Sequence, residues 1–154
     1  MRYDVPRIYS TPAIKMKNTP TIIFLNVADN ATKLKKLCET VRGHFSAKEK
    51  ILIAVSSDEA ASYIDQLLWR MPEESFMPHI TSEKKSNEHI VITKSNENIN
   101  GANVYINLRA EIPASMTGYH LIYDLLDLTH PTKADQSRKR QDAYQTSGYT
   151  FTEI

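Results

Sequence analysis

Short, continuous apolar segments alternate with helical segments along this chain of 154 residues, and this alternation constrains its fold more than any other feature. Residues 21–27 (TIIFLNV) and 51–55 (ILIAV) consist almost entirely of apolar and β-branched residues. Strands of this kind are buried on both faces, as in a parallel sheet that helices cover. The pattern therefore predicts a three-layer α/β/α domain with a mainly parallel sheet of about five strands.

Weaker patterns indicate the remaining elements. Turn-forming residues separate three further segments that we interpret as strands, at residues 89–94, 103–108 and 120–126. Three helices are expected, over residues 30–45, 57–71 and 132–147. Ser56, followed three residues later by Glu59, predicts a capping box at the start of the second helix. Gly148 predicts the end of the third helix.

The N-terminal segment differs in composition from the rest of the chain. Residues 1–19 contain two prolines and scattered basic residues and show no sustained period. This composition is typical of an extended or disordered arm. Residues 20–154 are long enough to bury one hydrophobic core, so we expect a single domain there.

Charge and cysteine content exclude several classes of protein. The formal net charge is only +1, so there is no overall electrostatic attraction to a nucleic-acid backbone. A single cysteine excludes an internal disulfide and fits a reducing compartment. No apolar run approaches the roughly 20 residues of a membrane span, and the N-terminus lacks the apolar region of a secretory signal. We therefore expect a cytoplasmic protein without membrane contact.

This architecture often holds a nucleotide, but the turns of this chain lack the residues that would bind one. The turn at residues 26–30 contains no glycine that would let a pyrophosphate approach, and neither GxGxxG nor GxxxxGK[ST] occurs. Asp58 and Glu59 at the start of the second helix would repel a phosphate. We therefore expect a Rossmann-like domain without a nucleotide site.

Catalytic and metal-binding patterns are not recognisable either. The five histidines show no ligand spacing, and one cysteine does not suffice for a zinc site. No serine or cysteine lies in a nucleophile motif. His79 follows Pro78 in a loop and is better explained as a hydrogen-bonded anchor than as an acid or base. No cofactor, no metal and no catalytic residue is expected.

Two aromatic residues lie outside the predicted core near the end of the second helix. At 100° per residue, Trp69 lies roughly 140° from Ile64, on the polar face of the helix. Pro72 ends the helix, and Phe76 follows in a short loop before Pro78. Two interpretations stay open. The aromatic side chains form an exposed patch for a partner, or they fold back under the loop as a satellite cluster.

The segment that carries these aromatic residues resembles a known family. Residues 68–79 fit the string LW-x-x-P-x-x-S-F-x-P-H, which is similar to the signature stretch of the chi subunit of bacterial DNA polymerase III, a part of the clamp-loader assembly. The run RKRQDAY at residues 138–144, closed by Gly148 and Tyr149, resembles the last helix of that family. The similarity covers about residues 21–152 in the same order.

The resemblance implies a bacterial, cytoplasmic adaptor without enzymatic activity. Chi-like proteins bind the clamp loader through the psi subunit, and a related helicase competes for the same surface. The residues that match this surface are Trp69, Phe76, Pro72 and Pro78. Together with the low net charge, the resemblance implies that the protein acts at DNA only indirectly, through other proteins.

The second surface of the family captures the acidic, phenylalanine-terminated tail of single-stranded-DNA-binding protein. Such a ligand requires a guanidinium group for its carboxylates and a small apolar pocket for its ring. Arg138 matches the key arginine of the family, and Leu126 is expected to form a wall of the pocket. The chain departs from the family pattern at Gln141 and Asp142, and Asp142 is spaced to pair with Arg138.

Two consequences of this departure stay open. Tail binding is weaker than in the family, or the pocket is displaced toward other basic residues of the same helix. The candidate residues for the tail surface are Arg138, Leu126, Lys133, Lys139, Arg140 and Tyr144. If the resemblance is set aside, the basic residues of this predicted helix are explained as an ordinary charged surface.

A second function of a different class is also considered. A small α/β enzyme would use His79 with a nearby carboxylate, Glu74 or Glu73, as acid and base. A buried Trp69 beside a pocket that holds His79 would favour this alternative over the adaptor.

Overall fold

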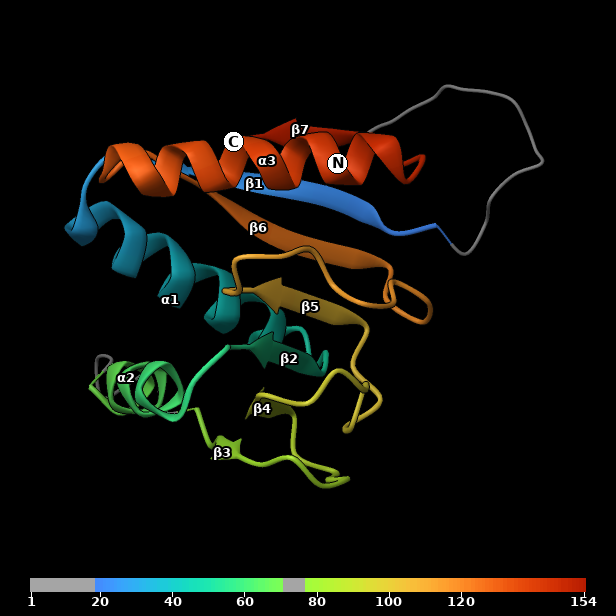
Figure 1. The fold of residues 1–154 in the computed structure, drawn as a ribbon. Coiled ribbons are helices and arrows are strands. Elements are labelled where there is room, and N and C mark those ends of the chain that lie inside the picture. The colour runs from blue at the N-terminus through green and yellow to red at the C-terminus, as the bar shows by residue number, and fades with distance from the viewer. Residues whose placement is uncertain (1–18, 71–76) are drawn as a thin grey trace.

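The computed structural model describes residues 19–70 and 77–154 and has one sheet of seven strands with helices on both faces (Figure 1). The strand order is β3-β4-β2-β5-β6-β1-β7, and every neighbouring pair is parallel. The strands are β1 (Thr21–Val27), β2 (Ile51–Ala54), β3 (Ile80–Thr81), β4 (Ile90–Thr93), β5 (Val104–Asn107), β6 (Leu121–Asp127) and β7 (Phe151–Glu153). The helices are α1 (Asn30–Ser46), α2 (Asp58–Trp69) and α3 (Pro131–Thr146).

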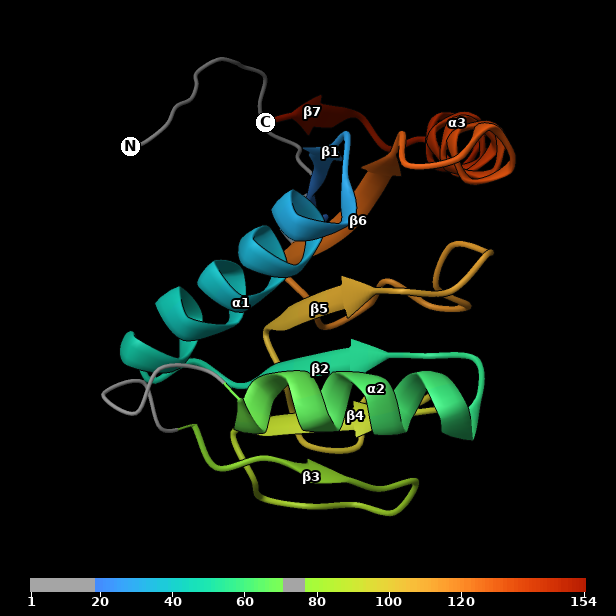
Figure 2. The same ribbon diagram turned by 90° about the vertical axis from the view of Figure 1, so that its left-hand side faces the viewer.

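The direction of each crossover decides which face of the sheet its helix covers. The connections β1-α1-β2 and β2-α2-β3 run one way along the strand order, and β6-α3-β7 runs the other way. Crossovers between parallel strands are right-handed, so helices of opposite direction lie on opposite faces. Accordingly α1 and α2 cover one face and α3 the other (Figure 2).

The core consists of two apolar clusters, one on each face of the sheet. Leu25 and Val41 belong to the cluster under α1 and α2. Phe24 and Tyr144 belong to the cluster on the side of α3, where their rings meet edge to face at 5.7 Å. Neighbouring residues of β1 thus serve opposite clusters, because side chains alternate along a strand.

The predicted fold class is confirmed, but the sheet is larger than expected. The sequence pattern missed β3 and β7, which lie at the two edges of the sheet and have two and three residues. Segments this short carry no measurable alternation. All five predicted strands and all three predicted helices are present, with boundaries shifted by a few residues.

The helix ends follow from local hydrogen bonds. Asp29 caps α1 by accepting from the Thr32 N–H at 2.7 Å. Ser57, not Ser56, caps α2 and accepts from the Ala60 N–H at 3.0 Å, so the predicted capping box of Ser56 and Glu59 is wrong. Gly148 follows α3 with φ +92°, the left-handed conformation that glycine adopts without strain, as predicted.

Two further points concern the predicted extent of the domain. The expected N-terminal arm, residues 1–19, lies outside the described residues except for Thr19. No helix in the described part of the chain is long and apolar enough to cross a membrane.

A buried carboxylate joins the sheet to α3. Asp124 of β6 has no exposed surface and accepts from Arg140 Nε at 2.9 Å, Tyr144 Oη at 2.9 Å and Asn107 Nδ2 at 3.0 Å. The Leu125 N–H is a fourth donor, at 2.7 Å. Burial raises the pKa of Asp124, and the Arg140 guanidinium and the other donors oppose this effect. The position of α3 on the sheet therefore depends on one buried ion pair.

Replacing Arg140 by methionine is expected to lower the free energy of unfolding by about 3–5 kcal/mol, because it leaves Asp124 buried without its charged partner. Arg138 on the same helix is exposed, and Arg138→Met is the matched control, with an expected effect within about 0.5 kcal/mol. Urea unfolding measures both values. Equal stability of the two variants would contradict the role assigned to the ion pair.

Candidate protein-interaction surfaces

Trp69 lies on the solvent-facing side of α2 at the C-terminal end of that helix. Its side chain is 51% exposed, whereas the neighbouring Leu68 is only 4% exposed. The buried side of α2 carries Ala61, Ile64 and Leu68, so the helix orientation follows from its apolar stripe. This orientation places the tryptophan in contact with water, as the helical periodicity predicts.

His79 lies just before β3 and contacts the C-terminal half of α2. Its ring packs against Trp69 with centroids 4.2 Å apart and planes tilted by 39°. Nδ1 bonds the Met77 carbonyl at 2.8 Å, and Nε2 lies 3.1 Å from both the backbone oxygen and Oδ1 of Asp65. The His79 side chain has no exposed surface. This geometry is that of a loop anchor that also supports the indole ring.

The geometry favours the partner surface over the enzyme alternative. A buried Trp69 would favour that alternative, and Trp69 is half-exposed. Its proposed carboxylates, Glu73 and Glu74, lie outside the described residues. Among residues 19–70 and 77–154, no group of three or more metal-ligating side chains lies close enough together to hold a metal ion.

The remaining residues of the predicted psi surface are only partly described. Pro72 and Phe76 lie outside the described residues, while Pro78 is exposed. Trp69 and Pro78 therefore flank the segment 71–76 on its two sides in the sequence. The indole ring of Trp69 is the described feature on which this surface depends.

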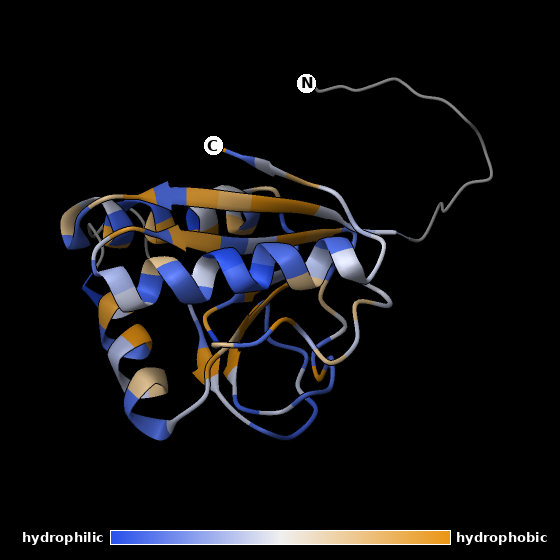
Figure 3. Cartoon of the chain, turned by 45° about the horizontal axis from the view of Figure 1, so that its top comes forward, coloured by the Kyte–Doolittle hydropathy of each residue, from blue (hydrophilic) through white to orange (hydrophobic). Residues whose placement is uncertain are grey.

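The six candidate residues of the tail surface fall into two groups. Lys133, Arg138 and Lys139 are exposed on α3. Figure 3 shows this helix mainly in hydrophilic colours in front of a hydrophobic sheet. The other group is buried: Leu126 is 4% exposed and Arg140 is 8% exposed.

Tyr144 belongs to the buried group and has no exposed surface. Its hydroxyl donates to Asp124, and burial together with the charge of Asp124 raises the pKa of Tyr144. Arg140 bonds the Leu125 carbonyl and Ser137 Oγ in addition to Asp124. Arg140, Tyr144 and Leu126 therefore serve the core and offer little area to a ligand.

The surroundings of Arg138 differ from those predicted. Within the described part of the chain, no ion pair joins Arg138 to Asp142. Lys139 instead pairs with Asp135 one turn earlier, at 3.2 Å. Gln141 is buried and donates to Glu153 of β7 at 2.8 Å. The expected neutralisation of Arg138 by Asp142 is therefore absent.

A cavity that the sequence did not reveal lies at the carboxyl ends of β2, β5 and β6. Its volume is about 250 Å³, and the first turns of all three helices contribute to its walls. The helices α1 and α3 leave the neighbouring strands β1 and β6 toward opposite faces, and the cavity lies beside this point, where open α/β sheets bind ligands. Its lining comes from distant segments, so no local motif marks it. The change of direction in the strand order is the signal that points to it.

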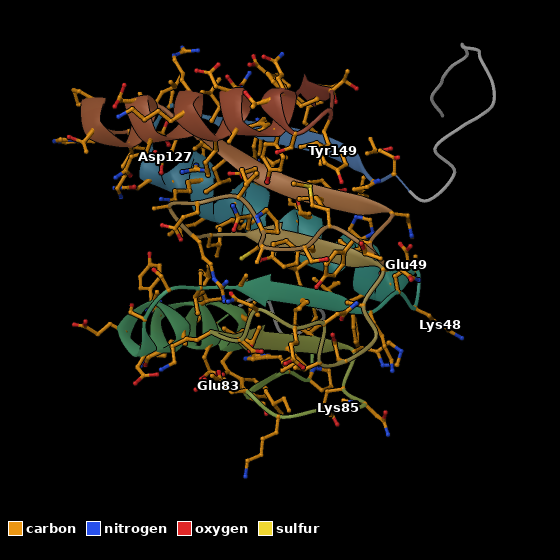
Figure 4. All side chains as sticks on the ribbon, turned by 45° about the vertical axis from the view of Figure 1, so that its right-hand side comes forward. Lys48, Glu49, Glu83, Lys85, Asp127 and Tyr149 are labelled. Carbon is orange, nitrogen blue, oxygen red and sulfur yellow. The ribbon has the colours of Figure 1, made fainter. Side chains whose placement is uncertain are left out.

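Basic side chains surround this cavity. Lys33 of α1 bonds Asp127 Oδ2 at 2.7 Å, at the end of β6 where α1 and α3 begin (Figure 4). Arg109 donates to the carbonyls of Val55 and Ser95 and to Asn96 Oδ1. Burial acts to raise the pKa of Asp127, but hydrogen bonds from Lys33 and Thr129 and the charge of Lys33 outweigh it and lower this pKa.

Comparisons with known proteins match this chain to one family. The family described as "DNA polymerase III chi subunit, HolC" matches residues 20–152 of this chain. The DNA polymerase III subunit chi of Escherichia coli (strain K12) is 24% identical over 142 residues, which is 88% of this chain and 96% of that relative.

Adjacent residues of α2 provide a test of the exposed position of Trp69. Trp69→Ala is expected to cost less than about 1 kcal/mol of unfolding free energy, because much of the side chain is already in water. Leu68→Ala is the matched control and is expected to cost about 2–5 kcal/mol, because it leaves a cavity in the core. Denaturant unfolding compares the two. A Trp69 variant as unstable as the Leu68 variant would refute the surface assignment.

Proposed function

This chain belongs to the DNA polymerase III chi subunit family, and from this we propose that it is a non-catalytic accessory subunit of the replicative polymerase. It links the clamp loader, through the psi subunit, to the acidic tail of single-stranded-DNA-binding protein. It works in the bacterial cytoplasm without a cofactor. Its net charge of +1 supports an indirect role at DNA, because attraction to a phosphate backbone requires a basic surface.

The main support for the proposed contact with the psi subunit is the half-exposed indole ring of Trp69. Tryptophan loses little conformational entropy on binding and buries a large area, so it is enriched among the residues that dominate interface energies. Trp69 is held in place by the buried ring of His79. A preorganised aromatic side chain of this kind is suited to a stable contact.

The exposed cations of α3 support the tail contact. Lys133, Arg138 and Lys139 are exposed, and carboxylates of an acidic peptide form charge-assisted hydrogen bonds with such groups. The terminal phenylalanine requires an apolar seat as well as these charges. An adaptor with these two surfaces needs no catalytic group.

The fluorescence of Trp69 provides a direct test of the proposed contact with the psi subunit. Trp69 is the only tryptophan of the chain, so its emission is expected to shift to the blue when the psi subunit of the same organism buries it. Trp69→Ala is expected to weaken the complex by at least about 2 kcal/mol in calorimetric titration. Tyr63→Ala, which removes another half-exposed aromatic side chain of α2, is the matched control. Equal affinity of the Trp69 variant and the wild type would reject this contact.

The tail contact is tested by titration with a short acidic peptide that ends in a free phenylalanine. Binding at low ionic strength is expected to weaken as salt is added, because carboxylates pair with exposed cations. Replacing the terminal phenylalanine by alanine is expected to abolish binding, since the ring supplies the apolar contact. Fluorescence anisotropy of a labelled peptide measures both effects. A peptide that binds equally well without its phenylalanine would exclude the proposed recognition.

A further inference from the structure

Both nitrogen atoms of the His79 ring face hydrogen-bond acceptors. The Nδ1 atom lies 2.8 Å from the carbonyl oxygen of Met77. The Nε2 atom lies 3.1 Å from both the carbonyl oxygen and the carboxylate oxygen Oδ1 of Asp65. A neutral imidazole has one N–H donor and one nitrogen lone pair, whereas an imidazolium has two donors. In this geometry only the charged ring donates a hydrogen bond from both nitrogens.

Burial of His79 and the charge of Asp65 act on the ring in opposite directions. The His79 side chain has no exposed surface, and removing a charge from water is costly. The Asp65 carboxylate opposes this cost, since an opposite charge within about 4–6 Å favours the charged form. The Asp65 side chain is 35% exposed, so this counter-ion keeps part of its own hydration. The ion pair therefore avoids the complete desolvation of both partners.

The other described charges of α2 lie farther from the ring or face solvent. Asp58 and Glu59 belong to the first turn of the helix, at least about 9 Å along its axis from Asp65. Arg70 follows Trp69 and is exposed. The strands β3 and β4, which pack against α2, contain no titratable residue. Of the described charged residues, Asp65 therefore acts most directly on the ring.

The His79 ring also lies against the indole ring of Trp69. The two centroids are 4.2 Å apart, and the planes are tilted by 39°. A cation within about 6 Å of the centroid of a tryptophan ring is attracted by its negative face, and more strongly where water is excluded. Asp65 and Trp69 are four residues apart on α2, so their side chains are neighbours on the helix surface. One imidazolium can therefore contact both.

We propose that His79 is a buried imidazolium, that Asp65 is its counter-ion, and that this charge positions the indole ring of Trp69 through a cation–π contact. Asp65 and His79 are then positioning residues, which act on the exposed surface through Trp69. The orientation of the indole depends on a proton bound inside the protein. This charge state is a property of the chain alone, whichever partner binds the indole ring.

His44 and His130 differ from His79, because each has a donor opposite one ring nitrogen. His44 Nε2 lies 2.7 Å from the hydroxyl of Tyr123, which can donate to it. His130 Nδ1 accepts from the Thr132 N–H at the start of α3. A neutral ring satisfies these contacts, whereas the contacts of His79 require a second proton.

NMR spectra of the histidine rings in the full-length, nitrogen-15-labelled protein measure this charge. Long-range proton–nitrogen correlations distinguish an imidazolium from either neutral tautomer, and wild-type His79 is expected to show the imidazolium pattern near neutral pH. In Asp65→Asn the counter-ion charge is lost, so His79 is expected to lose its proton at a pH lower by about one unit or more. Glu59→Gln removes the same charge from the first turn of α2 and is the matched control, with an expected change below about 0.3 unit. Asp65 is partly exposed and Glu59 is exposed, so both variants are expected to fold.

The fluorescence of Trp69, the only tryptophan of the chain, tests the cation–π contact. Its emission is expected to change over the pH range in which His79 loses its proton, because the charge at the indole face is lost. In Asp65→Asn this change is expected to move to lower pH together with the His79 signals. A bare ring nitrogen on His79 near neutral pH, or equal pH dependence of its signals in the wild type and Asp65→Asn, would overturn the imidazolium. An emission that stays constant while His79 loses its proton would overturn the contact with Trp69.

Discussion

The buried contact between Asp124 and Arg140 is the interaction on which the arrangement of this molecule depends. It connects the middle of the sheet to α3, and Asn107 and Tyr144 complete the hydrogen bonds of the carboxylate. Because Arg140 and Tyr144 must face Asp124, the rotation of α3 is determined. Lys133 and Gln136 then face the cavity, and Arg138 faces outward. A buried ion pair contributes little net stability, but removing one partner leaves the other charge buried and unpaired, which is costly.

The course of α2 places the cavity and the indole ring of Trp69 at opposite ends of the strands. The helix α2 runs antiparallel to the strands it connects and measures about 18 Å, from its twelve residues at 1.5 Å each. Its first turn borders the cavity at the carboxyl ends of the strands, and Trp69 ends it near their amino ends (Figure 2).

Prediction from the sequence succeeded where a local pattern has a single physical explanation. The apolar runs of β1 and β2 identify buried parallel strands, and the helical period of α2 places Trp69 in water. The sequence pattern missed the short edge strands β3 and β7, and it did not reveal that Arg140 and Tyr144 are buried. A basic residue in a polar helix is normally expected to be exposed to solvent. Only the ion pair with Asp124, which is distant in the sequence, makes Arg140 a core residue.

The sequence by itself determined the fold class, the family, the ends of α1 and α3 to within a residue or two, and the exposed tryptophan, because these depend on residues close together along the chain. The tertiary structure decided which cations of α3 reach solvent, and it assembled the cavity from β2, β5, β6 and three helices. These features depend on strand order and on contacts such as Asp124 with Arg140, sixteen residues apart in sequence. No periodicity or motif records such contacts, since they form only when the sheet is complete.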